Sequence, residues 1–185
     1  MALASRLAPL GTPAPTFQLP DLAGRHHALD DYANHSVLVV SFVCNHCPYV
    51  QHIESELGAV AARTSAGFVA VCSNDAATYP DDAPALLAEQ ARRADWRFDY
   101  LVDADQSVAR AFGAVCTPDF FVYGPDRKLA YRGAFDAATP KNGEPVNGSL
   151  LEDAISRILG GQSVPEPHRP SMGCGIKWLP GNEPT

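Results

Sequence analysis

The sequence has no long apolar run and no excess of basic residues, and each absence excludes a class of protein. Apolar runs such as 37–43 are far shorter than the roughly 18 residues that a membrane-spanning helix needs. The 14 Lys and Arg residues against 21 Asp and Glu residues give a net charge of −7. We therefore expect no nucleic-acid partner, because binding one requires a clustered basic surface.

The sequence also lacks the features of a secretory signal and of a static disulfide framework. Its first ten residues, MALASRLAPL, have neither a basic start nor a long apolar stretch, so we expect a cytoplasmic protein with no membrane partner. The five cysteines are an odd number, whereas disulfide frameworks belong to short secreted chains with even counts. In a reducing compartment, cysteines are more often buried small side chains, metal ligands or catalytic thiols.

Alternating strand and helix patterns predict an α/β fold with a mixed central sheet flanked by helices. The 185 residues, 46% of them hydrophobic, suit one domain with a substantial core. Continuous apolar runs predict buried strands, and apolar residues at helical spacing predict helices. The predicted strands are 35–43, 68–72, 100–103, 120–123 and 129–132, and the predicted helices are 48–66, 84–96, 108–112 and 150–159.

The two ends of this single domain, 1–185, are expected to differ from its centre. Residues 1–34 form an N-terminal extension with a hairpin around 21–24, and 160–185 form an irregular C-terminal tail. Gly67 is the expected C-cap of the first helix. Three histidines, His26, His27 and His168, are expected in loops.

A Cys-x-x-Cys segment lies where the first buried strand meets the first helix. Pro48 suits the first helical turn, which places Cys47 at the N-cap. The helix dipole and its free N–H groups would stabilise a thiolate there, and Cys44 could close a short disulfide with it. His46 stands between the two cysteines and either supports the thiolate when protonated or is a solvated loop histidine.

Two other interpretations of this segment stay open. A structural zinc site would use Cys44 and Cys47 with His46, His52 or Cys174, although no second closely spaced ligand pair is visible. Alternatively, the two cysteines are inert packing. We favour neither, and expect no metal, because the second ligand pair is missing. The sequence has no flavin or nicotinamide fingerprint, so we also expect no bound cofactor.

Four segments resemble a known family. The opening GTPAPTFQLPD, 11–21, resembles the start of the alkyl hydroperoxide reductase/thiol-specific antioxidant branch of the thioredoxin superfamily. The segment FVCNHCPYV, 42–50, together with GCGIKW, 173–178, and PGNEP, 180–184, resembles peroxiredoxin-like thioredoxin-family proteins described as thiol–disulfide isomerases. The resemblance covers nearly the whole chain from Gly11 and implies a thioredoxin-like fold.

The resemblance also implies roles for individual residues. Thr117-Pro118 matches the cis-proline segment that packs beside the reactive sulfur and offers its backbone to a partner. Counting five residues from the strand phenylalanine Phe42, as in thioredoxins, makes Cys47 the nucleophile and Cys44 an upstream resolving thiol. A plain interpretation of Cys-x-x-Cys reverses these roles, whereas the N-cap argument favours Cys47 as the thiol of lower pKa.

Three departures from the family patterns bear on the reaction. Thioredoxin's buried acid would fall at Ser41, which cannot replace a carboxylate. The peroxiredoxin pattern Pro-x-x-x-Thr/Ser-x-x-Cys is matched by Ser41 and Cys44, but Val37 replaces its proline, and no arginine lies near Thr117. We therefore expect a thiol–disulfide oxidoreductase acting on protein or low-molecular-weight thiols and disulfides, regenerated by a thioredoxin-like reductant. The alternatives are a thiol peroxidase and a zinc-binding or redox-sensing adaptor.

The remaining cysteines have different expected roles. Cys72 lies inside a predicted strand and is expected to be structural. Cys116 precedes Thr117 and either lines the site or is packing, which we favour. Cys174 lies between two glycines in the tail, where the backbone can approach closely, and is either a distal resolving thiol for Cys47 or part of an anchor with Trp178.

Overall fold

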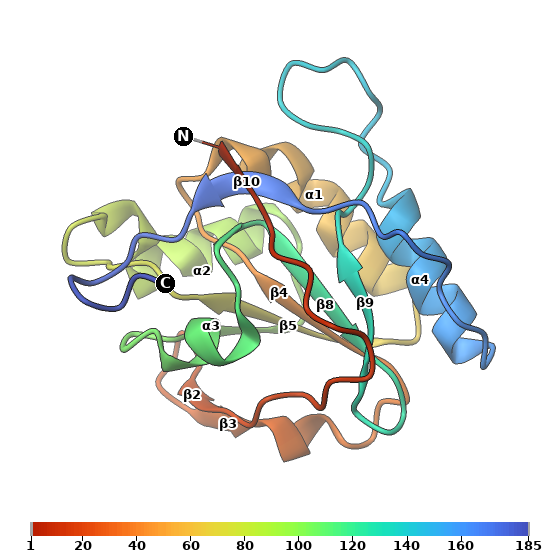
Figure 1. The fold of residues 1–185 in the computed structure, drawn as a ribbon. Coiled ribbons are helices and arrows are strands. Elements are labelled where there is room, and N and C mark those ends of the chain that lie inside the picture. Colours follow the sequence, from red (N-terminus) through yellow and green to blue (C-terminus); the bar gives the residue numbers. More distant parts are fainter. Residues whose placement is uncertain (1, 185) are drawn as a thin grey trace.

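A central five-stranded sheet, in the order β6-β5-β4-β8-β9, organises the computed structural model, which describes residues 2–184 (Figure 1). Strands β4, β5 and β6 are parallel, and β8 and β9 add to the β4 edge in antiparallel fashion. This mixed sheet confirms the predicted fold class. Its strands are β4 (Leu38–Phe42), β5 (Gly67–Cys72), β6 (Asp99–Val102), β8 (Asp119–Tyr123) and β9 (Leu129–Gly133).

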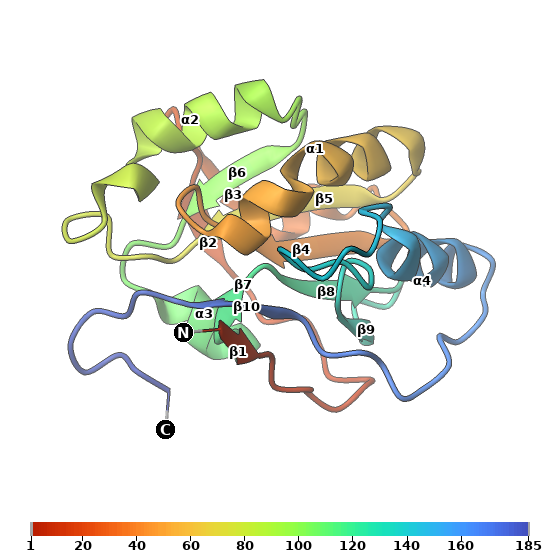
Figure 2. The same ribbon diagram turned by 90° about the horizontal axis from the view of Figure 1, so that it is seen from above.

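Helices cover both faces of this sheet (Figure 2). Alternate residues of β4 enter opposite cores: Val39 packs with α1, α2 and α4, whereas Leu38 and Val40 pack with α3 and the N-terminal hairpin. Burial on both faces explains the continuous apolar run that predicted this strand. The helices are α1 (Pro48–Arg63), α2 (Pro84–Arg93), α3 (Ser107–Phe112) and α4 (Ser149–Leu159).

Two smaller sheets and two short 3₁₀ helices complete the described chain. The predicted hairpin is confirmed as β2 (Gln18–Pro20) and β3 (His26–Ala28), and the 3₁₀ helices are η1 (Leu29–Tyr32) and η2 (Pro80–Asp82). The second small sheet has the order β1-β10-β7 and joins the two ends of the chain: β1 (Ala2–Ala4), β10 (Met172–Gly175) and β7 (Cys116–Thr117).

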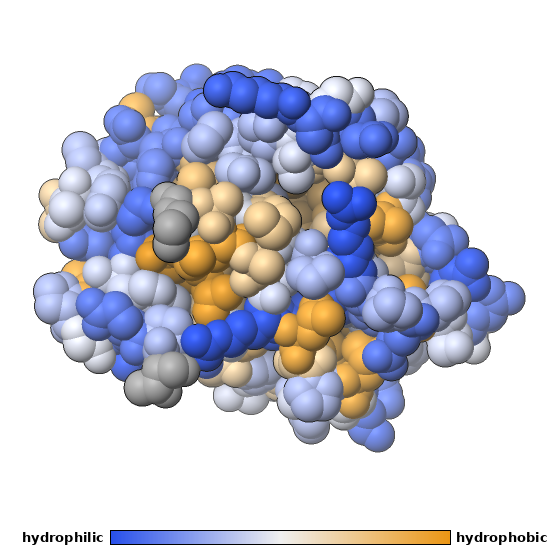
Figure 3. All heavy atoms as spheres, turned by 45° about the horizontal axis from the view of Figure 1, so that its top comes forward, coloured by the Kyte–Doolittle hydropathy of each residue, from blue (hydrophilic) through white to orange (hydrophobic). Residues whose placement is uncertain are grey.

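The prediction of an irregular C-terminal tail was therefore wrong for 172–175. This segment pairs with β7 on one side and with β1 on the other, so its backbone groups are satisfied by strands distant in sequence. The surface beside the N-terminal end carries apolar side chains among mostly hydrophilic ones (Figure 3). Leu3 of β1 and Met172 of β10 are 37% and 39% exposed.

Several local predictions also need correction. Helix α1 ends at Arg63, and Gly67 is the first residue of β5 rather than a C-cap. Gly67 is required there because a Cβ would overlap the ring of His35. His26 and His27 lie in β3 rather than in a loop. His168 does lie in a loop, but it is buried against Tyr131.

Within residues 2–184, no helix is both long and apolar enough to span a membrane.

Candidate functional site

The Cys-x-x-Cys segment connects the carboxyl end of β4 to the start of α1. Cys47 is the N-cap of this 16-residue helix, with extended backbone angles and Pro48 at the first helical position, as predicted. Its carbonyl accepts the N–H of Gln51, which forms the first helical turn. A side chain of α2 holds the loop before this helix in position: the buried Gln90 donates a hydrogen bond to the carbonyl of Cys44.

Both motif thiols meet at Thr117, which precedes a cis peptide bond to Pro118. The Sγ atom of Cys44 lies 3.3 Å from Thr117 Oγ1, and the Sγ atom of Cys47 lies 3.1 Å from the Thr117 carbonyl oxygen. The predicted cis-proline geometry is therefore confirmed. Residues 70 or more positions apart in sequence converge on one point at the end of the sheet.

The surroundings of Cys44 and Cys47 shift the pKa values of the two thiols in opposite directions. Hydrogen bonding from the Cys44 thiol, supported by the backbone N–H groups of Cys174 and Val50, lowers the pKa of Cys47 to about 5 against the opposing effect of burial. The same hydrogen bond, together with burial, raises the pKa of Cys44 well above its ordinary value. The arrangement therefore favours a thiolate at Cys47 and a protonated thiol at Cys44.

Cys174 is the third thiol of the cluster. Strand β10 pairs with β7 so that Cys174 lies opposite Thr117, and the Cys174 thiol also hydrogen bonds with Cys47. Cys44 and Cys47 are 1% and 0% exposed, whereas Cys174 is only partly buried. Burial and the neighbouring Cys47 raise the pKa of Cys174 to about 11.

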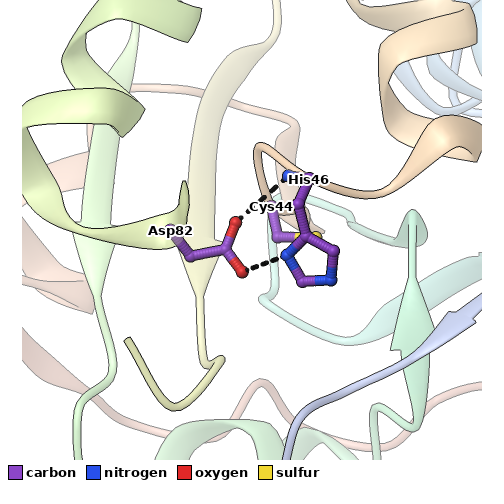
Figure 4. Close-up of side chains that lie close together, drawn as sticks. All are labelled: Cys44, His46 and Asp82. Atoms are coloured by element: carbon purple, nitrogen blue, oxygen red, sulfur yellow. Dashed lines mark hydrogen bonds and ion pairs between the residues drawn. The ribbon is translucent and has the colours of Figure 1, made fainter. Parts of the chain in front are cut away.

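A buried carboxylate, Asp82 of η2, lies beside Cys44 (Figure 4). Its Oδ2 lies 2.6 Å from His46 Nδ1, and its Oδ1 accepts the backbone N–H groups of Asn45 and His46. His46 also stacks on Tyr79, with ring centroids 5.5 Å apart. The structure thus directs His46 towards Asp82. Sequence reasoning missed Asp82 because nothing in the local pattern distinguishes it from its exposed neighbour Asp81.

The donor atoms of Cys44, His46 and Asp82 lie within 4.8 Å of one another, so these three residues could contact a metal ion. This set differs from the predicted zinc ligands, since it includes Asp82, and His52 is exposed on α1. Both oxygens of Asp82 are already used by protein donors, the second one also by Asn74 Nδ2. A metal ion would have to displace these bonds, so the cluster fits a hydrogen-bonding role better.

The other predicted residues lie around the thiols. The Ser41 hydroxyl donates to the Val69 carbonyl within the sheet. Cys72 and Cys116 are buried, and burial raises the pKa of both thiols. The buried Arg132 is held by Asp119 and the Gly113 carbonyl, so it is not available to bind a peroxide.

A thioredoxin-like fold with a cis-proline beside paired thiols defines the class of protein, a redoxin. The AhpC/TSA family model matches residues 10–132, and the chain belongs to this family. None of the curated proteins matches the chain.

Among solved structures, an uncharacterized conserved protein from Geobacillus kaustophilus is 41% identical, covers 98% of both chains and has a TM-score of 0.94. A hypothetical protein from Sinorhizobium meliloti is 40% identical, with coverage of 96% of this chain and 99% of that one and a TM-score of 0.93. A secreted Mycobacterium tuberculosis disulfide oxidoreductase shares the fold at 18% identity, with coverage of 76% and 94% and a TM-score of 0.61.

Proposed function

We propose that this redoxin is a thiol–disulfide oxidoreductase in which Cys47 is the nucleophile and Cys44 the resolving thiol. The observation that carries the proposal is the convergence of both thiols on Thr117 at the start of α1, with Cys47 at the N-cap. The N-cap position stabilises a thiolate at Cys47, and the shared contact with Thr117 keeps a second thiol adjacent to it.

The reaction needs two exchange steps. The Cys47 thiolate attacks one sulfur of a disulfide, forms a mixed disulfide and releases the other sulfur as a thiolate. Cys44 then loses its proton and attacks the Cys47 sulfur, which releases the second thiolate and leaves a Cys44–Cys47 disulfide. Two electrons pass from the protein to the substrate, and the same steps run in reverse when the oxidised protein meets a dithiol.

Asp82 and His46 supply the proton acceptor for the second step. In the reduced protein the Cys44 thiol donates to Cys47, but this acceptor is lost once Cys47 is bonded to a substrate sulfur. The carboxylate of Asp82 and the ring of His46 lie beside Cys44 and can take its proton. Asp82 and His46 would therefore take over the proton transfer that the buried acid performs in thioredoxins, whose position is Ser41 in this chain.

The expected substrates are protein or low-molecular-weight disulfides and thiols, and a thioredoxin-like reductant would restore the dithiol.

The experiment that tests the proposed function is the reaction of the reduced protein with oxidised glutathione, followed by acid quenching and mass-spectrometric mapping. We expect Cys47→Ser to lower the rate at least about 100-fold, since the reactive thiolate is removed. The matched control, Cys72→Ser, alters a buried cysteine outside the cluster and should react like the unchanged chain. An unchanged rate in Cys47→Ser would refute the assignment.

A thiol peroxidase is the second candidate, because the family takes its name from peroxide-reducing proteins and Cys47 is a stabilised thiolate. A peroxide would oxidise Cys47 to a sulfenic acid, which condenses with a second thiol and releases water. The commitment of Ser41 and Arg132 to other partners weighs against efficient peroxide binding. A second-order rate constant with hydrogen peroxide close to that of free cysteine would exclude this activity, and one far above it would establish it.

A further inference from the structure

Strand β10 covers the thiol that the proposed reaction needs. Cys47 is fully buried, and the Thr117 backbone next to it is paired with Cys174. An incoming thiol or disulfide must approach along the sulfur–sulfur axis, so it cannot reach Cys47 while β10 is in place. Of the three clustered thiols, Cys174 alone has appreciable exposure.

Strand β10 is built into the fold on both of its edges. Thr117 and Cys116 pair with Cys174 and Gly175 on one side, and β1 pairs along the other. Gly173 is required for this fit because a Cβ there would overlap the Thr117 carbonyl. The following residues are also anchored: the N–H of Lys177 donates to Asn74 Oδ1, and the N–H of Leu179 donates to Gln106 Oε1.

We propose that Cys174 is the sulfur through which this site exchanges with external thiols and disulfides, relaying electrons between them and the buried Cys44–Cys47 pair. This inference rests on the proposed function and adds the route by which a substrate reaches it: the disulfide that Cys47 attacks is the mixed disulfide between Cys174 and the substrate. Its basis is the position of Cys174 opposite Thr117, whose carbonyl oxygen lies 3.1 Å from Cys47 Sγ, together with the exposure of Cys174 and the burial of the other two thiols.

The relay is a sequence of balanced exchanges. The Cys174 thiolate attacks Cys47 in the Cys44–Cys47 disulfide, which releases the Cys44 thiolate and forms Cys47–Cys174. An external thiolate then attacks the Cys174 sulfur, releases the Cys47 thiolate and remains bonded to Cys174. A second external thiolate attacks that external sulfur and frees Cys174, so two external thiols become a disulfide and the protein gains two electrons.

The low pKa of Cys47 favours attack of an external thiolate on the Cys174 sulfur, with Cys47 as the leaving group. Because the low pKa of Cys47 makes its thiolate a good leaving group, a Cys47–Cys174 disulfide should break readily when the Cys174 sulfur is attacked. Met172, two residues before Cys174 and therefore on the same face of β10, is 39% exposed and provides apolar surface close to Cys174. A partner thiol could pack there while its sulfur approaches Cys174.

The test measures reduction of the fully oxidised protein by reduced glutathione, with adducts located by acid quenching and mass spectrometry. We expect Cys174→Ser, which keeps the buried Cys44–Cys47 disulfide, to be reduced at least about tenfold more slowly than the unchanged chain. Cys72→Ser is the matched control and should keep the normal rate. In Cys44→Ser, which can form Cys47–Cys174, the transient glutathione adduct should be on Cys174.

The possible results distinguish a failure of the Cys174 relay from a failure of the proposed thiol–disulfide exchange. A normal rate in Cys174→Ser, or an adduct on Cys47 in Cys44→Ser, would overturn the relay and leave the exchange reaction standing. Oxidised protein that contains neither a Cys44–Cys47 nor a Cys47–Cys174 bond would instead refute the proposed function. The adduct in Cys44→Ser gives a second, independent result if Cys174→Ser loosens β10.

Discussion

The acidity of Cys47 depends on its neighbours more than on the cysteine itself. The Cys44 thiol is the principal donor, and backbone N–H groups from β10 and α1 add to it. The sequence predicted the N-cap position, because Pro48 and the strand before it are local signals. It could not predict Asp82, whose approach to His46 depends on a fold that brings together residues 36 positions apart.

The role of Asp82 predicts a selective effect at the resolving step. Asp82→Asn should leave the first attack on oxidised glutathione nearly unchanged but slow formation of the Cys44–Cys47 disulfide at least about tenfold, because a proton acceptor is lost. Raising the pH should restore the rate, since hydroxide can then deprotonate Cys44. Rapid acid quenching and mass spectrometry follow both steps.

Asp81→Asn is the matched control, because Asp81 is the exposed neighbour of the buried Asp82. It should behave like the unchanged chain. An Asp82→Asn protein that slows both steps equally at every pH would show that Asp82 is only structural.

At the scale of elements, the central strands and helices followed from periodicity, whereas the β1-β10-β7 sheet did not. The β4 run is apolar because both of its faces are buried, so its character is visible in the sequence itself. Residues 172–175 have no such pattern, and two of the four are glycines. They form a strand because β7 and β1 offer backbone partners, which no local window reveals.

Gly173 should therefore be the position in β10 that is least tolerant of a side chain. We expect Gly173→Ala to lower the free energy of unfolding by about 1–3 kcal/mol, as overpacking usually does, because its Cβ would overlap the Thr117 carbonyl. Urea unfolding followed by circular dichroism measures the change.

Gly160→Ala provides a matched control after α4. Its backbone φ is −80° and its nearest neighbours would lie at ordinary contact distances, so its effect should stay within about 0.5 kcal/mol. If the two variants unfold alike, β10 is not packed against Thr117 as described.

At the scale of the whole molecule, the two ends of the chain close over a site built by the central sheet. The family resemblance predicted the thioredoxin-like fold around the central sheet correctly, but it did not predict that the C-terminal segment would bury Cys47. The reduced state gains from this closure, because the Cys47 thiolate receives hydrogen bonds from Cys44 and from Cys174 that a disulfide cannot use.

Reduced protein should therefore be more stable than oxidised protein at pH 7. We expect its Tm to be higher by at least about 2 °C, which corresponds to about 1 kcal/mol for a chain of this size. Because the pKa of Cys47 is lowered in the folded state, this contribution is complete only above the unfolded pKa of about 8.5, and it is lost as the pH falls through about 5. Thermal scans with and without dithiothreitol would measure it, and a higher Tm for the oxidised form would contradict it.

The most direct test of the central claim, a thiolate at Cys47, is a pH titration of thiolate absorbance at 240 nm in the fully reduced protein. The measurement does not require a reagent to reach the buried sulfur, and circular dichroism at each pH confirms that the protein stays folded. We predict a transition near pH 5 that is present in Cys72→Ser and absent in Cys47→Ser. A titration with no thiolate below pH 7, or one that persists without Cys47, would contradict it.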